Sequence, residues 1–109
     1  MLHKMKLQPD PFNRIVNGTK TVEFRLYDEK RQLVQIGDQI EFSKLPDLEE
    51  KIICDVIDLY REDKFETLFN KLISDKEEVA RKTQAMYQYY TPEEESKYGV
   101  LGIKIRLVK

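Results

Sequence analysis

The stretch GTKTVEFR, residues 18–25, places a lysine, a glutamate and an arginine in and just before a strand-like run. Within it, Glu23 and Arg25 alternate with apolar residues, and side chains two positions apart share one face of a strand. Lys20 opens the run, and its stem is long enough to bring the ammonium to that polar face. The pattern therefore predicts a strand over residues 20–27 with one apolar face and one face of ligand-binding groups.

The sequence on either side predicts further strands and short helices. Alternating apolar residues favour strands at 3–7, 39–43, 51–60 and 101–107. Apolar residues at helical spacing or capping residues favour helices at 11–17, 65–72, 75–90 and 92–98. We expect three of these helices to be capped by Asp10, Ser74 and Thr91. Gly99 is expected to end the last helix.

Strands interrupted by short helices within 109 residues favour an α+β fold. We expect a small, mostly antiparallel β-barrel of about five to six strands with short helices covering its ends. Barrel closure would also give the apolar C-terminal strand a neighbour that an exposed edge lacks. Because residues 1–109 contain no repeat, low-complexity tract or linker, we expect a single domain.

Composition narrows the classes of partner. The formal net charge is −1, whereas domains that grip duplex DNA by its phosphates are usually clearly basic, so no duplex DNA partner is expected. A single cysteine allows neither an internal disulfide nor a multi-cysteine zinc site, and we expect no metal and no cofactor. Since neither a secretory leader nor a membrane-spanning apolar run is recognisable, we expect a cytoplasmic protein.

Four residues match a family signature. Gly18, Lys20, Glu23 and Arg25 reproduce the pattern G-x-K-x-x-E-x-R, and the order of strands and the ending YGV at 98–100 fit the same family. On these residues the chain resembles ASCH domains, members of the PUA-like β-barrel superfamily, over almost its whole length. The resemblance implies a PUA-like barrel with a cleft beside its first helix, into which the signature side chains point.

The resemblance also implies RNA, or a modified nucleoside or nucleotide, as the partner. A lysine and an arginine are suited to phosphate or carbonyl oxygens, and a glutamate can accept a hydrogen bond from a base amino group. Unpaired bases also need stacking surfaces, which tyrosines provide. The candidate ligand-binding residues are Lys20, Glu23, Arg25, Tyr89, Glu95 and Tyr98.

A metal-independent hydrolase is the alternative. The resemblance extends to small family members that act as amidohydrolases on acetylated cytidine with a lysine, a threonine and a glutamate, and a ribonuclease is a second form of this alternative. The catalytic candidates are then Lys20, Thr21 and Glu23, although Glu23 fills the threonine position and Thr21, one residue after Lys20, points to a different side of the sheet from Lys20. A lysine acts as a base only where burial or another cation favours its neutral form, and a nearby carboxylate favours the charged form. The remaining acidic member would be Asp75, Glu77 or Glu78.

Each candidate also has a plainer interpretation. The charged residues within 20–25 would be a solvated cluster if their face lay outward. Glu95 suits the positive end of a helix dipole, and Tyr98 suits core packing as well as stacking. His3 is interpreted as a structural or exposed residue, because no second ligand at the spacing of a metal site accompanies it. Cys54 is interpreted as a small core residue on the buried face of its strand, because a reactive thiol needs exposure and a neighbouring cation. A protein-interaction domain is a third functional class, and the oligomeric state stays open.

Overall fold

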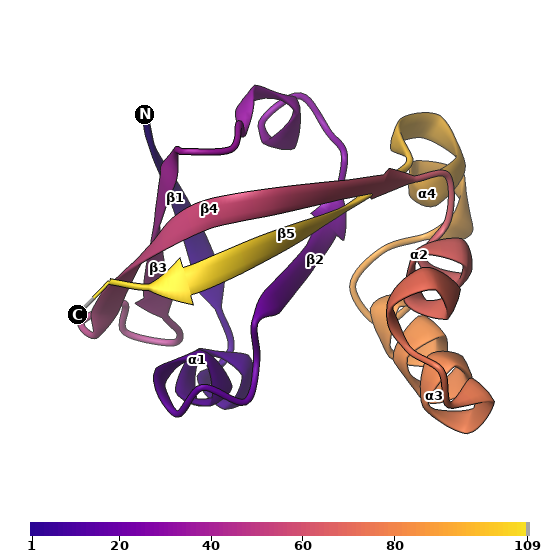
Figure 1. The fold of residues 1–109 in the computed structure, drawn as a ribbon, viewed down its shortest axis with the longest axis horizontal. Coiled ribbons are helices and arrows are strands. Elements are labelled where there is room, and N and C mark those ends of the chain that lie inside the picture. Colours follow the sequence, from indigo (N-terminus) through magenta and orange to yellow (C-terminus); the bar gives the residue numbers. More distant parts are fainter. Residues whose placement is uncertain (109) are drawn as a thin grey trace. The chain divides into compact units, whose positions relative to one another are not determined.

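The computed structural model describes residues 1–108, and five strands within them form one sheet in the order β1-β3-β4-β5-β2 (Figure 1). The strands are β1 (Leu2–Leu7), β2 (Val22–Leu26), β3 (Gln39–Lys44), β4 (Lys51–Glu62) and β5 (Val100–Leu107). β1 pairs with β3 in parallel, and β3 pairs with β4 in antiparallel orientation. Because β5 lies between β4 and β2, the apolar C-terminal strand has a neighbour on each side.

Short helices connect the strands. They are α1 (Pro9–Val16), the 3-10 helix η1 (Arg31–Leu33), α2 (Phe65–Leu72), α3 (Lys76–Met86) and α4 (Pro92–Tyr98). This mixture of sheet and helices confirms the expected α+β class.

The chain forms two compact units. The first unit comprises residues 1–23, 34–59 and 103 onward, and the second comprises residues 24–33 and 60–102. Strands β2, β4 and β5 contribute residues to both units.

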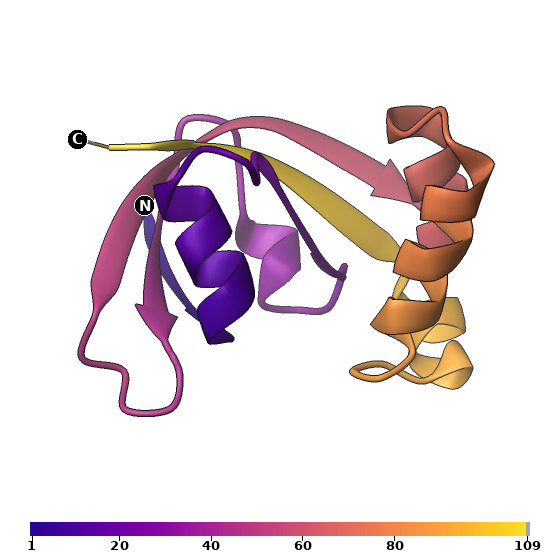
Figure 2. The same cartoon turned by 90° about the horizontal axis from the view of Figure 1, so that it is seen from below.

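In the first unit, α1 packs on the buried face of the sheet. Alternate residues of β1 are buried, and the pairing register places them beside Ile40 and Phe42 of β3. Helix α1 contacts β3 and buries Phe12 and Ile15, and Figure 2 shows the helix beside these strands. The ammonium of Lys44 lies 5.6 Å from the centroid of the Phe12 ring, so the helix covers the end of β3 as well.

The second unit is built around the contact between α2 and α3. Phe65 and Phe69 of α2 are buried, and the ring of Tyr90 stacks on Phe65 with centroids 5.7 Å apart. Phe24 meets Phe69 edge to face at 4.7 Å. These ring pairs, together with buried aliphatic side chains such as Leu68, form a core of the second unit's own residues.

Two predicted helix starts are wrong. Helix α1 begins at Pro9 with Gln8 as its N-cap, so Asp10 lies inside the first turn and caps nothing. Proline suits the first helical position because its ring presets the backbone, and here the first of two nearby prolines takes that role. Before α3 the N-cap is Asp75 and not Ser74, since the Asp75 carboxylate accepts a hydrogen bond from the Glu77 N–H at 3.0 Å.

The start and end of α4 are as predicted. The Thr91 hydroxyl accepts from the Glu94 N–H at 3.1 Å, and the Glu94 carboxylate accepts from the Thr91 N–H at 3.0 Å, which completes a capping box. Gly99 ends the helix with φ +74°, and a Cβ at this position would lie 3.1 Å from the carbonyl oxygen of Glu62. A glycine is therefore needed both for the backbone conformation and for the close approach.

Candidate functional site

Backbone hydrogen bonds hold Lys20 ahead of β2. The carbonyl oxygen of Arg14 accepts from the N–H groups of Thr19 at 2.9 Å and Lys20 at 3.0 Å. The side-chain oxygen of Asn17 accepts from the Thr19 N–H at 3.0 Å and from its hydroxyl at 2.7 Å. Between them, Gly18 adopts φ +86°, a conformation that favours glycine. The loop that leaves α1 thus gives Lys20 a defined backbone position.

Lys20 and Glu23 form a largely buried ion pair. The lysine Nζ lies 3.3 Å from the glutamate Oε1, and the two side chains are only 12% and 7% exposed. The pair is therefore not the solvated surface cluster of the plainer interpretation. It offers an ammonium donor and a carboxylate acceptor side by side, which is what recognition of a polar ligand needs.

The strand that follows Lys20 and carries Glu23 differs from the expected pattern in its burial. Val22 and Phe24 are only half-buried, whereas Glu23 is buried. Thr21 is exposed, and its carbonyl oxygen accepts from the N–H of Ile105 at 2.9 Å, which ties the segment ahead of β2 to β5. The strand is also shorter than predicted, because β2 begins at Val22 and ends at Leu26.

Arg25 lies two residues beyond Glu23 on β2 and is half-buried. It belongs to the second unit, whereas Lys20 and Glu23 belong to the first. Because side chains alternate along a strand, Arg25 shares the face of β2 on which Glu23 lies.

In the second unit, Glu95 holds two protein donors. This side chain of α4 is 4% exposed. Its carboxylate accepts from the N–H of Phe65 at 2.9 Å and from the hydroxyl of Tyr87 at 2.9 Å. Phe65 is the first residue of α2, and Lys64 at the N-cap position makes no side-chain cap bond. Glu95 thus caps α2 from another helix and satisfies a backbone donor that would otherwise be orphaned.

The hydrogen bond to Glu95 raises the pKa of Tyr87, with burial and the glutamate's charge acting in the same direction. Of the two tyrosines predicted to stack on bases, Tyr89 is 63% exposed and Tyr98 is half-buried. Tyr98 packs against the second unit's core, and the ammonium of Lys97 lies 4.9 Å from its ring centroid. Tyr89 is therefore accessible for stacking, whereas Tyr98 contributes to packing.

The three acidic residues considered for a catalytic set lie at the start of α3. Asp75 is occupied as the N-cap, Glu77 is exposed, and Glu78 is half-exposed. All three belong to the second unit.

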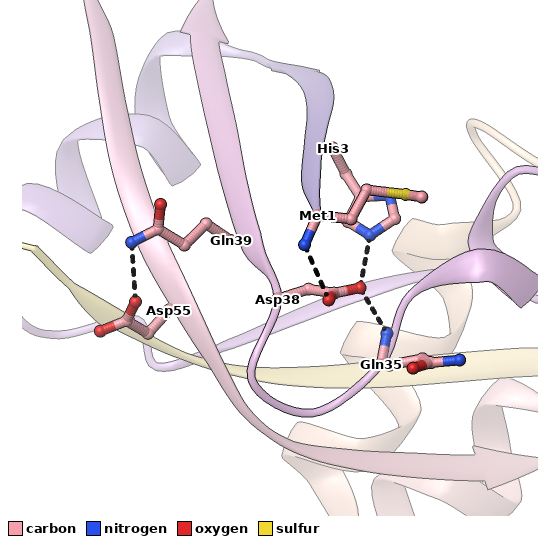
Figure 3. Close-up of polar contacts among 6 residues, drawn as sticks. All are labelled: Met1, His3, Gln35, Asp38, Gln39 and Asp55. Carbon is pink, nitrogen blue, oxygen red and sulfur yellow. Dashed lines mark hydrogen bonds and ion pairs between the residues drawn. The ribbon is translucent and has the colours of Figure 1, made fainter.

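A further polar cluster surrounds Asp38 in the first unit (Figure 3). His3 Nε2 lies 2.8 Å from one Asp38 oxygen, which also accepts from the Gln35 N–H at 3.0 Å. The Met1 ammonium lies 3.2 Å from the other oxygen. These partners, with the His3 hydrogen bond the most important, lower the pKa of Asp38 to about 2. The structural interpretation of His3 is thus supported, and the cluster ties β1 to the turn before β3.

Cys54 lies fully buried on β4. Burial, with the charge of Asp55 as a smaller contribution, raises the pKa of its thiol to about 11. A thiol in this state is unreactive, which agrees with its interpretation as a core residue. Residues 1–108 contain no group of three or more acidic, histidine or cysteine side chains placed to hold a metal ion. No helix in the described range is long and apolar enough to cross a bilayer.

Solved structures similar to this chain share its fold. The hypothetical protein PH0355 is 28% identical, with a TM-score of 0.86, over 99% of this chain and 100% of that chain. Protein PF0455 from Pyrococcus furiosus is 29% identical, with a TM-score of 0.72, over 100% of this chain and 99% of that chain. ASCH from Zymomonas mobilis is 18% identical, with a TM-score of 0.60, over 96% of this chain and 66% of that chain. No curated protein matches the chain.

The family model of the ASCH domain matches residues 5–109 of this chain. This match spans residues of both units, and the likeness to the Zymomonas mobilis ASCH structures confirms the expected PUA-like fold. The chain therefore belongs to the ASCH domain family.

Proposed function

We propose that this ASCH domain binds RNA, or a modified nucleoside or nucleotide, through Lys20, Glu23 and Arg25. ASCH domains are commonly RNA-binding, which sets the class of ligand. The observation that carries the proposal is the ion pair of Lys20 and Glu23, which lies almost out of water at the start of β2.

The pair is hard to explain by stability alone. Removing two charges from water costs several kcal/mol, and apolar residues of similar volume often serve stability equally well. Ligand binding explains why the pair is buried, because the ammonium can donate to a phosphate or carbonyl oxygen while the carboxylate accepts from a base amino group. Arg25, the other cation of the family signature, has a planar guanidinium suited to a two-pronged grip on an oxyanion.

Binding is favoured over hydrolysis by the surroundings of Lys20. A catalytic lysine base must be neutral, whereas a carboxylate at 3.3 Å favours the charged ammonium. Thr21, the hydroxyl residue that follows Lys20, is exposed and precedes the strand, so it lies outside the buried pair. We therefore propose Lys20 as a charged donor to the ligand and not as a base.

A titration of fluorescently labelled single-stranded RNA, followed by anisotropy, tests the proposal. Lys20→Ala is expected to weaken binding at least about tenfold, the worth of one charge-assisted hydrogen bond. Lys82→Ala, which removes a lysine from α3, is the matched control and is expected to bind as the wild type does. Because loss of the lysine alone removes the ammonium beside the buried Glu23 carboxylate, the double variant Lys20→Met/Glu23→Leu, which removes both charges, provides a second test that keeps the protein folded.

Two results would contradict the proposal. In the first, the folded double variant binds RNA and a panel of modified nucleosides as tightly as the wild type does. This result would show that the ion pair takes no part in recognition. In the second, the wild type hydrolyses an acylated nucleoside or RNA, and Lys20→Ala does not. This result would favour the hydrolase alternative over the binding function.

A further inference from the structure

The outward face of the sheet in the first unit carries an excess of positive charge. Residues of β1 and β4 that alternate with the buried ones point away from the core. The register aligns Lys6 with Ser43 of β3, and Ser43 with Lys51 of β4, so the two lysines flank one serine on this face. Arg106 of β5 joins this face through its contact with Asp55, and Lys104 follows two residues earlier on the same side of β5. Among the described residues, the cations of the face are thus Lys4, Lys6, Lys51, Lys104 and Arg106, and its carboxylates are Glu41 and Asp55.

Asp55 organises one corner of this face. Its Oδ1 accepts from the side-chain amide of Gln39 at 3.1 Å, as Figure 3 shows, and its Oδ2 lies 3.4 Å from a guanidinium nitrogen of Arg106. The Arg106 side chain is nevertheless 70% exposed, so the guanidinium keeps donors that face solvent. Helix α1 packs on the opposite, buried face of β3 and leaves the outward face uncovered by that helix.

This local excess contrasts with the chain as a whole. Within residues 1–108, five cations and two carboxylates share the face, whereas the full chain has a formal net charge of −1. Lysines spaced two residues apart on one strand are about 7 Å from each other, and strands two apart in a sheet are separated by about 10 Å. The charges thus form an extended field and not a single point, which suits a polyanion better than a small anion.

We propose that this cationic face, defined by Lys4, Lys6, Lys51, Lys104 and Arg106, is a second contact surface for the sugar–phosphate backbone of a single-stranded RNA. The inference rests on the proposed function, because the same RNA strand supplies the group bound at Lys20 and Glu23. Contacts to phosphates carry no sequence information but add affinity that depends on salt. The face offers no aromatic ring for stacking among these residues, so it holds the backbone while recognition of the base belongs to the β2 site.

The experiment measures the affinity of two single-stranded RNAs of the same base composition, one of about 5 and one of about 20 nucleotides. Only the longer strand can span several phosphate contacts, so the cationic face is expected to add affinity for that strand alone. In Lys6→Gln/Lys51→Gln, loss of two contacts is expected to weaken binding of the longer RNA roughly 10- to 30-fold at about 0.1 M salt. The slope of log K against log salt is expected to become flatter by about 1.4, and binding of the short RNA is expected to stay unchanged.

Arg81→Gln/Lys82→Gln on α3 removes the same charge from the second unit and is the matched control, with unchanged binding expected. If the face variant binds the longer RNA with wild-type affinity and salt slope, while Lys20→Met/Glu23→Leu weakens both RNAs, the second contact surface is wrong and the proposed function stands. If the wild type binds neither RNA, both are wrong.

Discussion

Two buried glutamates, one in each unit, are used in different ways. Glu23 in the first unit pairs with the ammonium of Lys20 at 3.3 Å. Glu95 in the second unit accepts from a backbone N–H at the start of α2 and from a tyrosine hydroxyl. Their exposed fractions are nearly equal, at 5% and 4%, so burial does not distinguish the two carboxylates.

The kind of partner does distinguish them. Glu95 meets donors that the fold would otherwise leave unsatisfied, so its role is explained by the stability of the second unit. Glu23 instead brings a second charge out of water, which seldom improves stability over an apolar pair. We therefore propose that the partner of each buried carboxylate, and not its burial, separates Glu23 as a ligand-binding candidate from Glu95 as a structural residue.

The largest expected effect belongs to Glu95. Glu95→Ala leaves the Phe65 N–H and the Tyr87 hydroxyl without their acceptor, and we expect the free energy of unfolding to fall by about 3 kcal/mol. Chemical denaturation measures this loss. Glu93→Ala, which removes an exposed carboxylate from the same helix turn, is expected to change it by less than about 0.5 kcal/mol.

RNA binding by folded Glu95→Ala is expected to match the wild type. If folded Glu95→Ala instead lost much of its RNA affinity, Glu95 would be a ligand-binding residue, as the sequence first suggested. The two buried glutamates would then no longer differ in their roles.

A smaller effect is expected from Tyr87→Phe, which removes one of the two donors to Glu95 and is expected to cost about 1 kcal/mol. The folded state raises the pKa of Tyr87, mainly through that hydrogen bond. The stability from this contact is therefore present below the unfolded pKa of about 10 and is lost as the pH rises through the folded pKa. Thermal unfolding between pH 8 and 11 measures the difference between the two proteins, which should shrink at the alkaline end. A difference that stays constant over this range would show that the phenol proton plays no part.

The smallest effect is expected at Asp38, which is a half-buried carboxylate of the first unit that pairs with His3. Its folded pKa of about 2 lies below its ordinary value of 3.8, so it stabilises the fold above about pH 4 and loses this contribution as the pH falls toward 2. Asp38→Asn is expected to melt below the wild type at pH 7, with the difference vanishing near pH 2. An undiminished difference at pH 2 would contradict this assignment.

The sequence was a good guide where local chemistry sets the structure. The capping box of Thr91 and Glu94 and the glycine that ends α4 depend on residues only a few positions apart, and both were predictable. The five strands and the family signature were also recognisable, because alternation of apolar residues reports the buried face of a sheet.

Features that depend on distant residues were not predictable. The sequence offered Glu95 as a helix-start carboxylate or a ligand-binding residue, and only the fold brings the N–H of Phe65, thirty positions away, to its carboxylate. Likewise, alternation at β2 predicted buried Val22 and Phe24, yet Glu23 is more buried because its burial depends on the rest of the first unit. The cationic face was not predicted, although Lys4 and Lys6 alternate with apolar residues. Lys51 joins them only through the pairing registers of β1 with β3 and of β3 with β4, which the sequence of a single strand does not determine.

The most direct test compares Lys20→Met/Glu23→Leu with the wild type in two measurements, chemical denaturation and RNA titration. If the ion pair serves recognition, the double variant will have a free energy of unfolding within about 1 kcal/mol of the wild type, or higher, and will bind RNA at least about tenfold more weakly. A variant that loses stability yet keeps its RNA affinity would assign the pair to the fold and contradict its role in binding.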